Sequence, residues 1–361
     1  MQLYKLKELY SISSGLSKPA SQFGYGNPFL SFSIVFNNYH IPSSLIDLVN
    51  TSPLEIKRFS IKRGDVFVTR TSEKLDELGK SCVALQDYEK ATFNGFCKRL
   101  RPIVNESIIL PEYAQYLFRS KQFTNQIIYS CPMSTRASLN EEILNTIVLN
   151  IHSLSEQRHI VDIIGSLDDK IENNNKIIEK LWQKLQLVHT DFKSKNELVE
   201  KNILELADIK YGKGIPTSEI LKDGLYSVYG SNGIIGYLNN YTFKEHKIAI
   251  SCRGNSSGII HLTDENSTVT SNSLVLDFKN FDYTYYFFLE FMYKGLYEYK
   301  TGSAQPQITI DNLKILNLQV PKNINDYIKN INDSVEYTFC LKKENQKLFL
   351  LKQFYLKKFF G

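Results

Sequence analysis

The stretch SLSEQRHIVDIIGSLDDKIENNNKIIEKL, residues 153–181, carries the strongest periodic pattern in this chain of 361 residues. Starting within it, residues spaced alternately four and three apart form a series that is apolar except for one asparagine: Ile160, Ile164, Leu167, Ile171, Asn174, Ile178, Leu181, Leu185 and Val188. This spacing aligns them along one face of a helix, as in a coiled coil. Ser153, with Glu156 three residues later, marks the helix start because the two side chains can satisfy free backbone donors of the first turn.

A second long helix is predicted near the end of the chain, from about residue 323 to residue 360. Its apolar positions are less regular, since Ile328, Ile331 and Val335 are followed after a shift by Leu341, Leu348, Leu351 and Tyr355. The shift predicts a stutter or a local unwinding. Because the first helix leaves one module and enters the next, a second helix packed on it has to run antiparallel. The first series rises about 42 Å at 1.5 Å per residue, somewhat more than one turn of B-DNA.

On either side of the first helix the sequence repeats with a period near half its length, a self-similarity that identifies duplicated folds. The aligned pairs, in chain order, are LKELYSISSG with ILELADIKYG, RGDVFVTRTS with HKIAISCRGNSSG, ATFNGF with VTSNSL, YAQYLFRSKQF with YTYYFFLEFMY, and RASLNEEILNTIVLNI with QPQITIDNLKILNLQV. Identity is low in every pair, but all five occur in one order. The alignment makes Arg70 equivalent to Arg253 and Asn94 equivalent to Asn272.

Composition narrows the class of protein. With 42% hydrophobic and 12% aromatic residues the chain has the make-up of a folded protein, and the net charge of +5 permits an anionic partner without requiring one. The five cysteines, Cys82, Cys97, Cys131, Cys252 and Cys340, include no Cys-x-x-Cys pair, which argues against a disulfide framework and a zinc site. The sequence has no apolar run of signal-peptide or membrane-spanning length. These features favour a reducing cytoplasm.

The pieces EQ-x-x-I, LDDKIE and NNKI of the first helix resemble the central conserved helix of the specificity subunits of type I restriction-modification systems. In the second half, IKYGKGIP, YSVYGSNGIIGY and TGSAQPQIT resemble stretches of the target-recognition domains of that family. The first half resembles it less, through RGDVFVTR and STRASLN, and the last helix departs most, with PKNINDYIKNINDSVEY.

The resemblance implies an α+β fold with two similar target-recognition domains, residues 1–152 and 196–321. Two long antiparallel helices, residues 153–195 and 322–361, would separate them as a coiled-coil spacer with pseudo-twofold symmetry. Such a subunit reads a bipartite, asymmetric site in double-stranded DNA and docks two methyltransferase subunits and, through them, endonuclease subunits that translocate DNA. It is no enzyme by itself and holds no cofactor, because S-adenosylmethionine belongs to the methyltransferase and ATP with Mg²⁺ to the endonuclease.

Sixteen polar or glycine positions are candidate DNA contacts. They are Lys18, Tyr25, Asn27, Ser31, Arg70 and Asn94 in the first module, and Lys213, Gly214, Tyr229, Ser231, Asn232, Arg253, Asn255, Asn272, Gln305 and Gln307 in the second. An arginine fork is the commonest reader of guanine, and glutamine can bind adenine in a bidentate manner. Lysine in a glycine-containing loop can approach phosphate.

Each candidate also has a structural interpretation. Arg70 and Arg253 can instead pair with a phosphate or a carboxylate, and the glycine-containing loops around Lys18 and Lys213 can be ordinary exposed turns. Asn-Gly in YGSNG is also a routine hairpin signal, and Pro306 can simply end a loop.

On the first helix, Asn174 is interpreted as a register device, because a polar residue at a heptad core position disfavours other alignments. Trp182 either anchors a partner subunit or packs under a recognition domain. The acidic group Asp168, Asp169 and Glu172 could hold a metal, but on a heptad helix we interpret it as a solvated or partner-facing surface.

Two alternatives remain beside the specificity-subunit hypothesis. A self-contained DNA-modifying enzyme would need a catalytic motif, and the sequence contains no P-loop, no HExxH and no GxSxG with a plausible triad. A coiled-coil adaptor that binds no nucleic acid would fit the helices but not the recognition-domain motifs.

Overall fold

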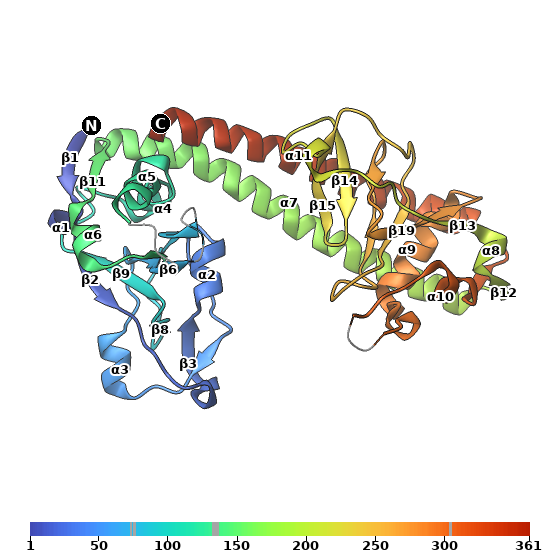
Figure 1. The fold of residues 1–361 in the computed structure, drawn as a ribbon, viewed down its shortest axis with the longest axis horizontal. Coiled ribbons are helices and arrows are strands. Elements are labelled where there is room, and N and C mark those ends of the chain that lie inside the picture. The colour runs from blue at the N-terminus through green and yellow to red at the C-terminus, as the bar shows by residue number, and fades with distance from the viewer. Residues whose placement is uncertain (73, 75–76, 132–136, 303–304) are drawn as a thin grey trace. The chain divides into compact units, whose positions relative to one another are not determined.

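The computed structural model describes residues 1–72, 74, 77–131, 137–302 and 305–361. The chain divides into two compact units: unit 1 comprises residues 1–172 with 346–361, and unit 2 comprises residues 173–345. Each unit combines sheets with part of two long helices, α7 (Leu154–Lys195) and α11 (Asn325–Phe360), which confirms the expected α+β class (Figure 1). In the part of the chain that is described, no helix is long and apolar enough to cross a membrane.

Apart from α7 and α11, the elements fall into two series in chain order. Unit 1 contains β1 (Gln2–Lys5), α1 (Leu6–Leu9), β2 (Tyr10–Ser14), η1 (Ala20–Gln22), β3 (Phe23–Leu30), α2 (Phe32–Asn37), β4 (Leu48–Val49), α3 (Pro53–Arg58), β5 (Val66–Thr69), β6 (Thr71–Ser72), β7 (Ser81–Val83), β8 (Thr92–Phe93), β9 (Cys97–Pro102), α4 (Pro111–Leu117), α5 (Lys121–Ser130), β10 (Ala137–Ser138), α6 (Glu141–Thr146) and β11 (Val148–Ile151). Unit 2 contains β12 (Leu198–Asn202), α8 (Ile203–Leu206), β13 (Ala207–Tyr211), η3 (Thr217–Glu219), β14 (Tyr226–Gly230), β15 (Gly233–Leu238), β16 (Ile248–Ser251), β17 (Ile260–Leu262), β18 (Thr268–Val269), β19 (Ser273–Phe278), α9 (Asp282–Lys294), η4 (Tyr297–Tyr299), α10 (Ile310–Lys314) and β20 (Asn317–Pro321).

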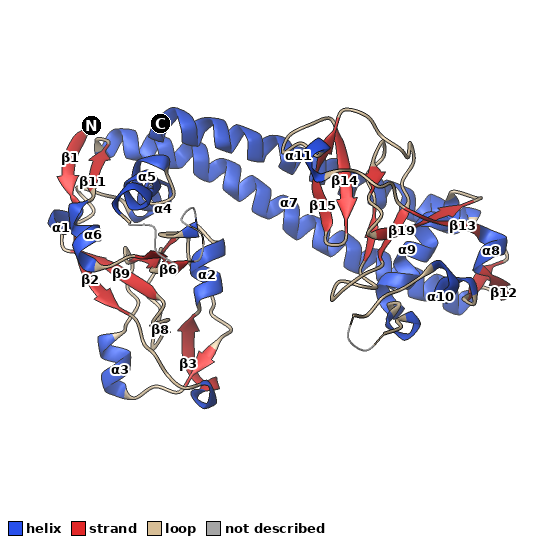
Figure 2. Ribbon diagram, in the orientation of Figure 1, coloured by secondary structure: helices blue, strands red, loops and turns tan. Residues whose placement is uncertain are grey.

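The sheet topology of unit 1 recurs in unit 2. A four-stranded sheet has the order β2-β9-β5-β7 in unit 1 and β13-β19-β16-β17 in unit 2. A three-stranded sheet follows the order β4-β3-β8 in one and β15-β14-β18 in the other, each with one parallel pair, and β1-β11 corresponds to β12-β20. The paired strands β1 and β11, and β14 and β15, can be followed in Figure 2. Because strand order and orientation both repeat, the structure confirms the internal duplication.

Strand register corrects the equivalence of the two arginines. Thr69 lies opposite Cys97 in unit 1, where Ser251 lies opposite Ser273 in unit 2. Arg70 follows Thr69, and Cys252 follows Ser251. The carbonyl oxygen of Arg70 accepts from the N–H of Leu139, and that of Cys252 accepts from the N–H of Ile308. Arg253 is therefore equivalent to Thr71, and the alignment by residue type was wrong by one position. A slip of one residue matters because it moves a side chain to the opposite face of a strand.

The pairing of Asn94 with Asn272 was also wrong, by two positions. The N–H of Leu16 donates to Phe93 where the N–H of Lys213 donates to Val269, so Asn94 corresponds to Thr270. The two asparagines were matched because both sit in short polar loops after a strand, where sequence alone sets no register.

Gly15 and Gly212 occupy equivalent positions in the two units, where another backbone segment lies too close to leave room for a side chain. Their N–H groups donate to Cys97 and Ser273, the same position of β9 and β19. A Cβ atom would lie 2.1 Å from the carbonyl oxygen of Asn94 at the first glycine and 2.3 Å from that of Thr270 at the second. Only glycine fits such an approach.

The two cores are built alike. In unit 1 the four-stranded sheet packs against α4, α5 and the start of α7, so that Tyr113, Phe118 and Ile164 are buried together. In unit 2 the equivalent sheet packs against α9 and against α7 and α11, with Leu185 and Ile331 in the same core. Burying one such side chain contributes about 1.5–3 kcal/mol.

Within each unit, α7 and α11 pack antiparallel along the predicted series. Asp168 contacts Lys352 in unit 1, while in unit 2 Asn174 contacts Asn345 and His189 contacts Tyr327. Ile160, Ile164, Asn174 and Leu185 are fully buried, and Leu167, Ile171, Ile178, Leu181 and Val188 are partly buried. The Ser153 hydroxyl and the Glu156 carboxylate cap the first turn as expected.

One position of the α11 series was wrong. Leu351 is 42% exposed, whereas the next residue, Lys352, is only 6% exposed. The Lys352 ammonium pairs with Asp168 at 2.6 Å and lies 4.0 Å from the centre of the Tyr39 ring. A buried lysine is tolerated when its charge is paired in this way.

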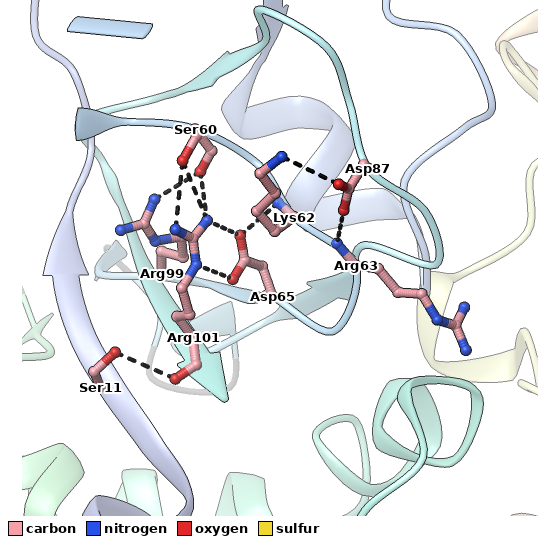
Figure 3. A network of polar contacts seen from close by, with 8 residues as sticks. All are labelled: Ser11, Ser60, Lys62, Arg63, Asp65, Asp87, Arg99 and Arg101. Atoms are coloured by element: carbon pink, nitrogen blue, oxygen red, sulfur yellow. Dashed lines mark hydrogen bonds and ion pairs between the residues drawn. The ribbon is translucent and has the colours of Figure 1, made fainter. Parts of the chain in front are cut away.

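An ion pair occupies the same place in both units with its charges exchanged. In unit 1 the guanidinium of Arg101, in β9, binds Asp65, just before β5, through two bonds of 2.7 and 2.6 Å (Figure 3). At the equivalent positions of unit 2, Lys247 precedes β16 and pairs with Asp277 of β19 at 2.7 Å. The duplication has kept the contact and inverted its polarity.

Candidate nucleic-acid interface

Most of the predicted contacts in unit 2 gather on loops that bond to one another. Ser271 donates its N–H to the carbonyl of Lys213 at 3.0 Å, and the Ser231 hydroxyl reaches the carbonyl of Asn272 at 3.5 Å. The Ser256 hydroxyl donates to Oδ1 of Asn232 at 2.5 Å. These bonds hold the loops after β13, β14, β16 and β18 together. We call this the loop cluster of unit 2: residues 213–214, 231–232, 253–257, 270–272 and 305–307.

The side chains of the loop cluster point largely to solvent. Lys213, Asn232, Arg253, Asn255, Asn272, Gln305 and Gln307 are exposed, and Gly214 has open space around it. Arg253 and Gln307 form an antiparallel bridge between the loop after β16 and the segment before α10. The cluster thus presents donors and acceptors of the kinds that read base edges.

Tyr229 does not belong to this surface, although the sequence grouped it with Ser231 and Asn232. Its ring is 6% exposed and packs in a small core with Phe243 and Val275. Its hydroxyl accepts from the N–H of Asp264 at 3.1 Å, and burial raises its pKa. Tyr229 is buried by this packing, as are its neighbours in β14, so the hydroxyl serves the fold.

A hollow lined by four lysines lies beside the loop cluster. It has a volume of about 510 Å³, and its lining includes Lys210, Lys213, Lys244 and Lys247. Lys210 and Lys247 both bond Asp277, at 2.8 and 2.7 Å, in its wall. Although burial opposes ionisation of Asp277, these bonds outweigh it and hold its pKa below the ordinary value.

Two lysines of the hollow remain available to an external anion. Lys213 and Lys244 are exposed, and neither forms an ion pair with any residue that the structure describes. Lys213 belongs also to the loop cluster, so the hollow and the cluster form one continuous surface. Sequence reasoning missed Lys244, because the segment YTFKEHK that contains it matches no recognised motif.

The predicted contacts of unit 1 separate into two groups. Arg70, Asn94 and Ser31 lie close together, since the N–H of Arg70 donates to Phe96 and that of Asn94 to Leu30, the neighbour of Ser31. The Asn94 side chain accepts from the N–H of Phe96 at 2.7 Å and so closes its own turn. Arg70 is partly buried, with its Nε buried and without a partner among the described atoms. Residues 134–136 of the STRASLN segment lie outside the described residues.

The other three, Lys18, Tyr25 and Asn27, do not join that group. The Lys18 ammonium pairs with Glu55 at 2.8 Å, and this hydrogen bond lowers the pKa of Glu55 to about 2. Asn27 donates to the Thr51 hydroxyl at 2.9 Å and lies opposite Val49 on β3, away from the Leu30 end. Tyr25 is 48% exposed but shares that distant end of the strand.

Comparison with known proteins shows the family of the chain. The family described as type I restriction modification DNA specificity domain matches residues 1–183 and again residues 195–352. The chain belongs to this family. It is 28% identical over 186 residues to the type I restriction enzyme HindI specificity subunit of Haemophilus influenzae, a stretch covering 51% of this chain and 39% of that protein.

A solved structure shows the same fold. The S subunit of a type I restriction-modification system from M. genitalium matches with a TM-score of 0.63, over 100% of this chain and 96% of that one, at 15% identity. The two specificity-domain copies of the family model correspond to the repeated sheet topology described above.

Two of the predicted helix residues, Asp168 and Trp182, form contacts within the fold of this specificity-domain protein. Asp168 accepts from the Tyr116 hydroxyl and pairs with Lys352. No group of three potential metal-binding side chains occurs among the described residues, Asp169 and Glu172 included. Trp182 packs against Phe288 in the core of unit 2, with ring centres 5.5 Å apart, which favours its structural interpretation over partner anchoring.

Proposed function

We propose that this chain is the DNA sequence-specificity subunit of a type I restriction-modification complex. It reads a bipartite, asymmetric site in double-stranded DNA, one half-site with each unit. The observation that carries the proposal is the continuous surface of unit 2, in which exposed base-reading side chains adjoin a hollow with two available lysines.

The two parts of that surface match the two kinds of contact that DNA recognition needs. Lysines bind phosphates, which fixes the position of a protein on the duplex, whereas side chains that reach base edges determine the sequence. Lys213 and Lys244 supply the first kind of contact, and Arg253, Asn232 and Gln307 the second.

The two units supply different chemistry at equivalent places, so the half-sites they read differ. Arg253 and Gln307 of unit 2 occupy the positions of Thr71 and Ser138 in unit 1. Since the short side chains cannot form the same contacts, a repeated fold carries two unlike readers.

We also propose that α11 contributes to docking of the methyltransferase subunits. Leu350 and Phe354, one helical turn apart, are 57% and 60% exposed, and Lys347 and Lys357, three residues away on either side, are exposed as well. An apolar patch rimmed by lysines suits a partner groove with acidic edges. In this proposal the partner subunits carry out the chemistry. Two methyltransferase subunits bind S-adenosylmethionine, and the endonuclease subunits bind ATP and Mg²⁺. The complex acts in the cytoplasm.

The dependence of DNA binding on salt tests the proposal. Each phosphate contact that is lost should reduce the slope of log affinity against log salt by about 0.9, so Lys213→Ala with Lys244→Ala should reduce it by nearly 2. Lys201→Ala, an exposed lysine of the β12-β20 sheet, is the matched control and should leave the slope unchanged. Binding by the unmodified full chain that shows no preference among duplex sequences would overturn the proposal.

A further inference from the structure

We propose that Arg253 and Gln307 act as one pair that reads two adjacent base pairs in the half-site of unit 2, a G·C pair through Arg253 and an A·T pair through Gln307. This inference rests on the proposed function and adds the identity of two neighbouring bases.

The backbone sets the direction of both side chains. Arg253 and Gln307 are partners in an antiparallel bridge, and next to them Ile308 donates its N–H to the carbonyl of Cys252 at 3.0 Å. Cys252 and Ile308 are each 1% exposed. Because successive side chains of extended backbone alternate between faces, Arg253 and Gln307 point together to the exposed face.

Their spacing suits neighbouring base pairs. Residues directly opposite each other in an antiparallel pair have Cβ atoms about 4.5–5.5 Å apart, and stacked bases along a strand of B-DNA are about 3.4 Å apart. Two long side chains starting side by side can therefore reach successive base edges in the major groove. An arginine fork fits O6 and N7 of guanine, and a glutamine amide fits N6 and N7 of adenine.

Both side chains have room to make these contacts. Neither forms a hydrogen bond or an ion pair through its side chain with a residue in the described part of the chain. Gly254, directly after Arg253, has a φ of +69°, and a Cβ atom built there would meet nothing within 4 Å. The described residues thus leave open space at Gly254, beside Arg253.

Unit 1 offers an internal comparison. There the equivalent bridge joins Thr71 and Ser138, and the arginine, Arg70, stands one position earlier. Arg70 occupies the position equivalent to the buried Cys252 of unit 2, and the Nε atom of Arg70 is itself buried. The paired reader is thus a property of unit 2 alone.

Selection from a library of randomised duplexes with the full chain tests the pair. The enriched site should contain adjacent G·C and A·T pairs. Arg253→Lys keeps the charge but loses the fork, so discrimination at the G·C position should fall by about 5- to 150-fold, with non-specific affinity unchanged. The isosteric Gln307→Glu should relax the neighbouring A·T position. Thr71→Ala and Ser138→Ala are the matched controls and should leave both positions intact.

The outcomes separate this inference from the proposed function. If the relaxed positions are not adjacent, or if Arg253→Lys leaves guanine preference intact, the paired reading is wrong while sequence recognition stands. If Arg253→Ala weakens binding to every duplex equally, Arg253 contacts phosphate instead. If no sequence is enriched by the unmodified chain, the proposed function itself fails.

Discussion

Asn174 and Asn345 stand at the same position of two repeated helices and bond to each other. Each lies twenty residues after the first residue of its helix, Leu154 in α7 and Asn325 in α11. Nδ2 of Asn174 donates to Oδ1 of Asn345 at 2.9 Å and to Glu344 at 2.8 Å, and Asn174 is fully buried. A polar contact at the matching point of two antiparallel helices fixes their register, because any slip separates the partners.

Replacing Asn174 by alanine should destabilise the chain by about 1–3 kcal/mol, since it leaves polar partners without their donor. Urea unfolding followed by circular dichroism measures the loss. Asn173→Ala, at an exposed neighbouring position, should change stability by less than about 0.5 kcal/mol. Equal effects of the two substitutions would contradict a pairing role for Asn174.

The inverted ion pair predicts a rescue by exchange. Asp65→Lys and Arg101→Asp should each cost about 3–5 kcal/mol, because each leaves like charges facing each other in a site where Asp65 is fully buried. The double variant recreates the polarity of Lys247 and Asp277 and should regain at least half of the summed loss in urea unfolding. Strict additivity of the two losses would show that the positions do not interact.

Two glycines in one loop should respond differently to alanine. At Gly212 a Cβ atom would lie 2.3 Å from the Thr270 carbonyl oxygen, whereas at Gly214 it would meet nothing within 4 Å. Gly212→Ala should therefore lower stability by about 1–3 kcal/mol and weaken DNA binding through the displaced Lys213. Gly214→Ala should preserve stability, and thermal unfolding of both variants, with a DNA-binding titration of Gly212→Ala, can check these expectations. Similar behaviour of both variants would refute the close approach.

Glu290 should make stability depend on pH. Burial raises its pKa, but bonds from His189, Lys193 and Lys294 outweigh this effect and hold the pKa well below the ordinary value of 4.5. Because the pKa is lower in the folded state, ionised Glu290 stabilises the fold fully above about pH 4.5, and this stabilisation is lost as the pH falls further. Urea unfolding at several pH values should show this decline in the unmodified chain and a shallower one in Glu290→Gln. Glu219→Gln, at an exposed site, should follow the unmodified chain.

Local and periodic signals predicted the frame of the fold. The cap formed by Ser153 and Glu156, the heptad series and the order of duplicated segments all depend on residues close in sequence, and each was found as expected. The family motifs of the first helix likewise identified the family that the comparison established.

Long-range pairing could not be predicted from one sequence. Lys352 is buried because Asp168, 184 residues earlier, neutralises it, and a pattern of apolar residues selects Leu351 instead. The offset between Arg70 and Arg253 follows from strand register, which becomes visible only when β9 and β19 are placed. The burial of Tyr229 likewise depends on residues further along the chain, such as Val275, that pack against it.

The account is tested most directly by mapping methylated bases in the genome of cells that carry this chain together with the methyltransferase subunits proposed as its partners. We predict one motif of two unlike half-sites separated by a spacer of fixed length, in which Arg253→Lys relaxes one half-site and leaves the other unchanged. A single uninterrupted motif, or methylation that is indifferent to this chain, would contradict the claim that two unlike units read a divided site.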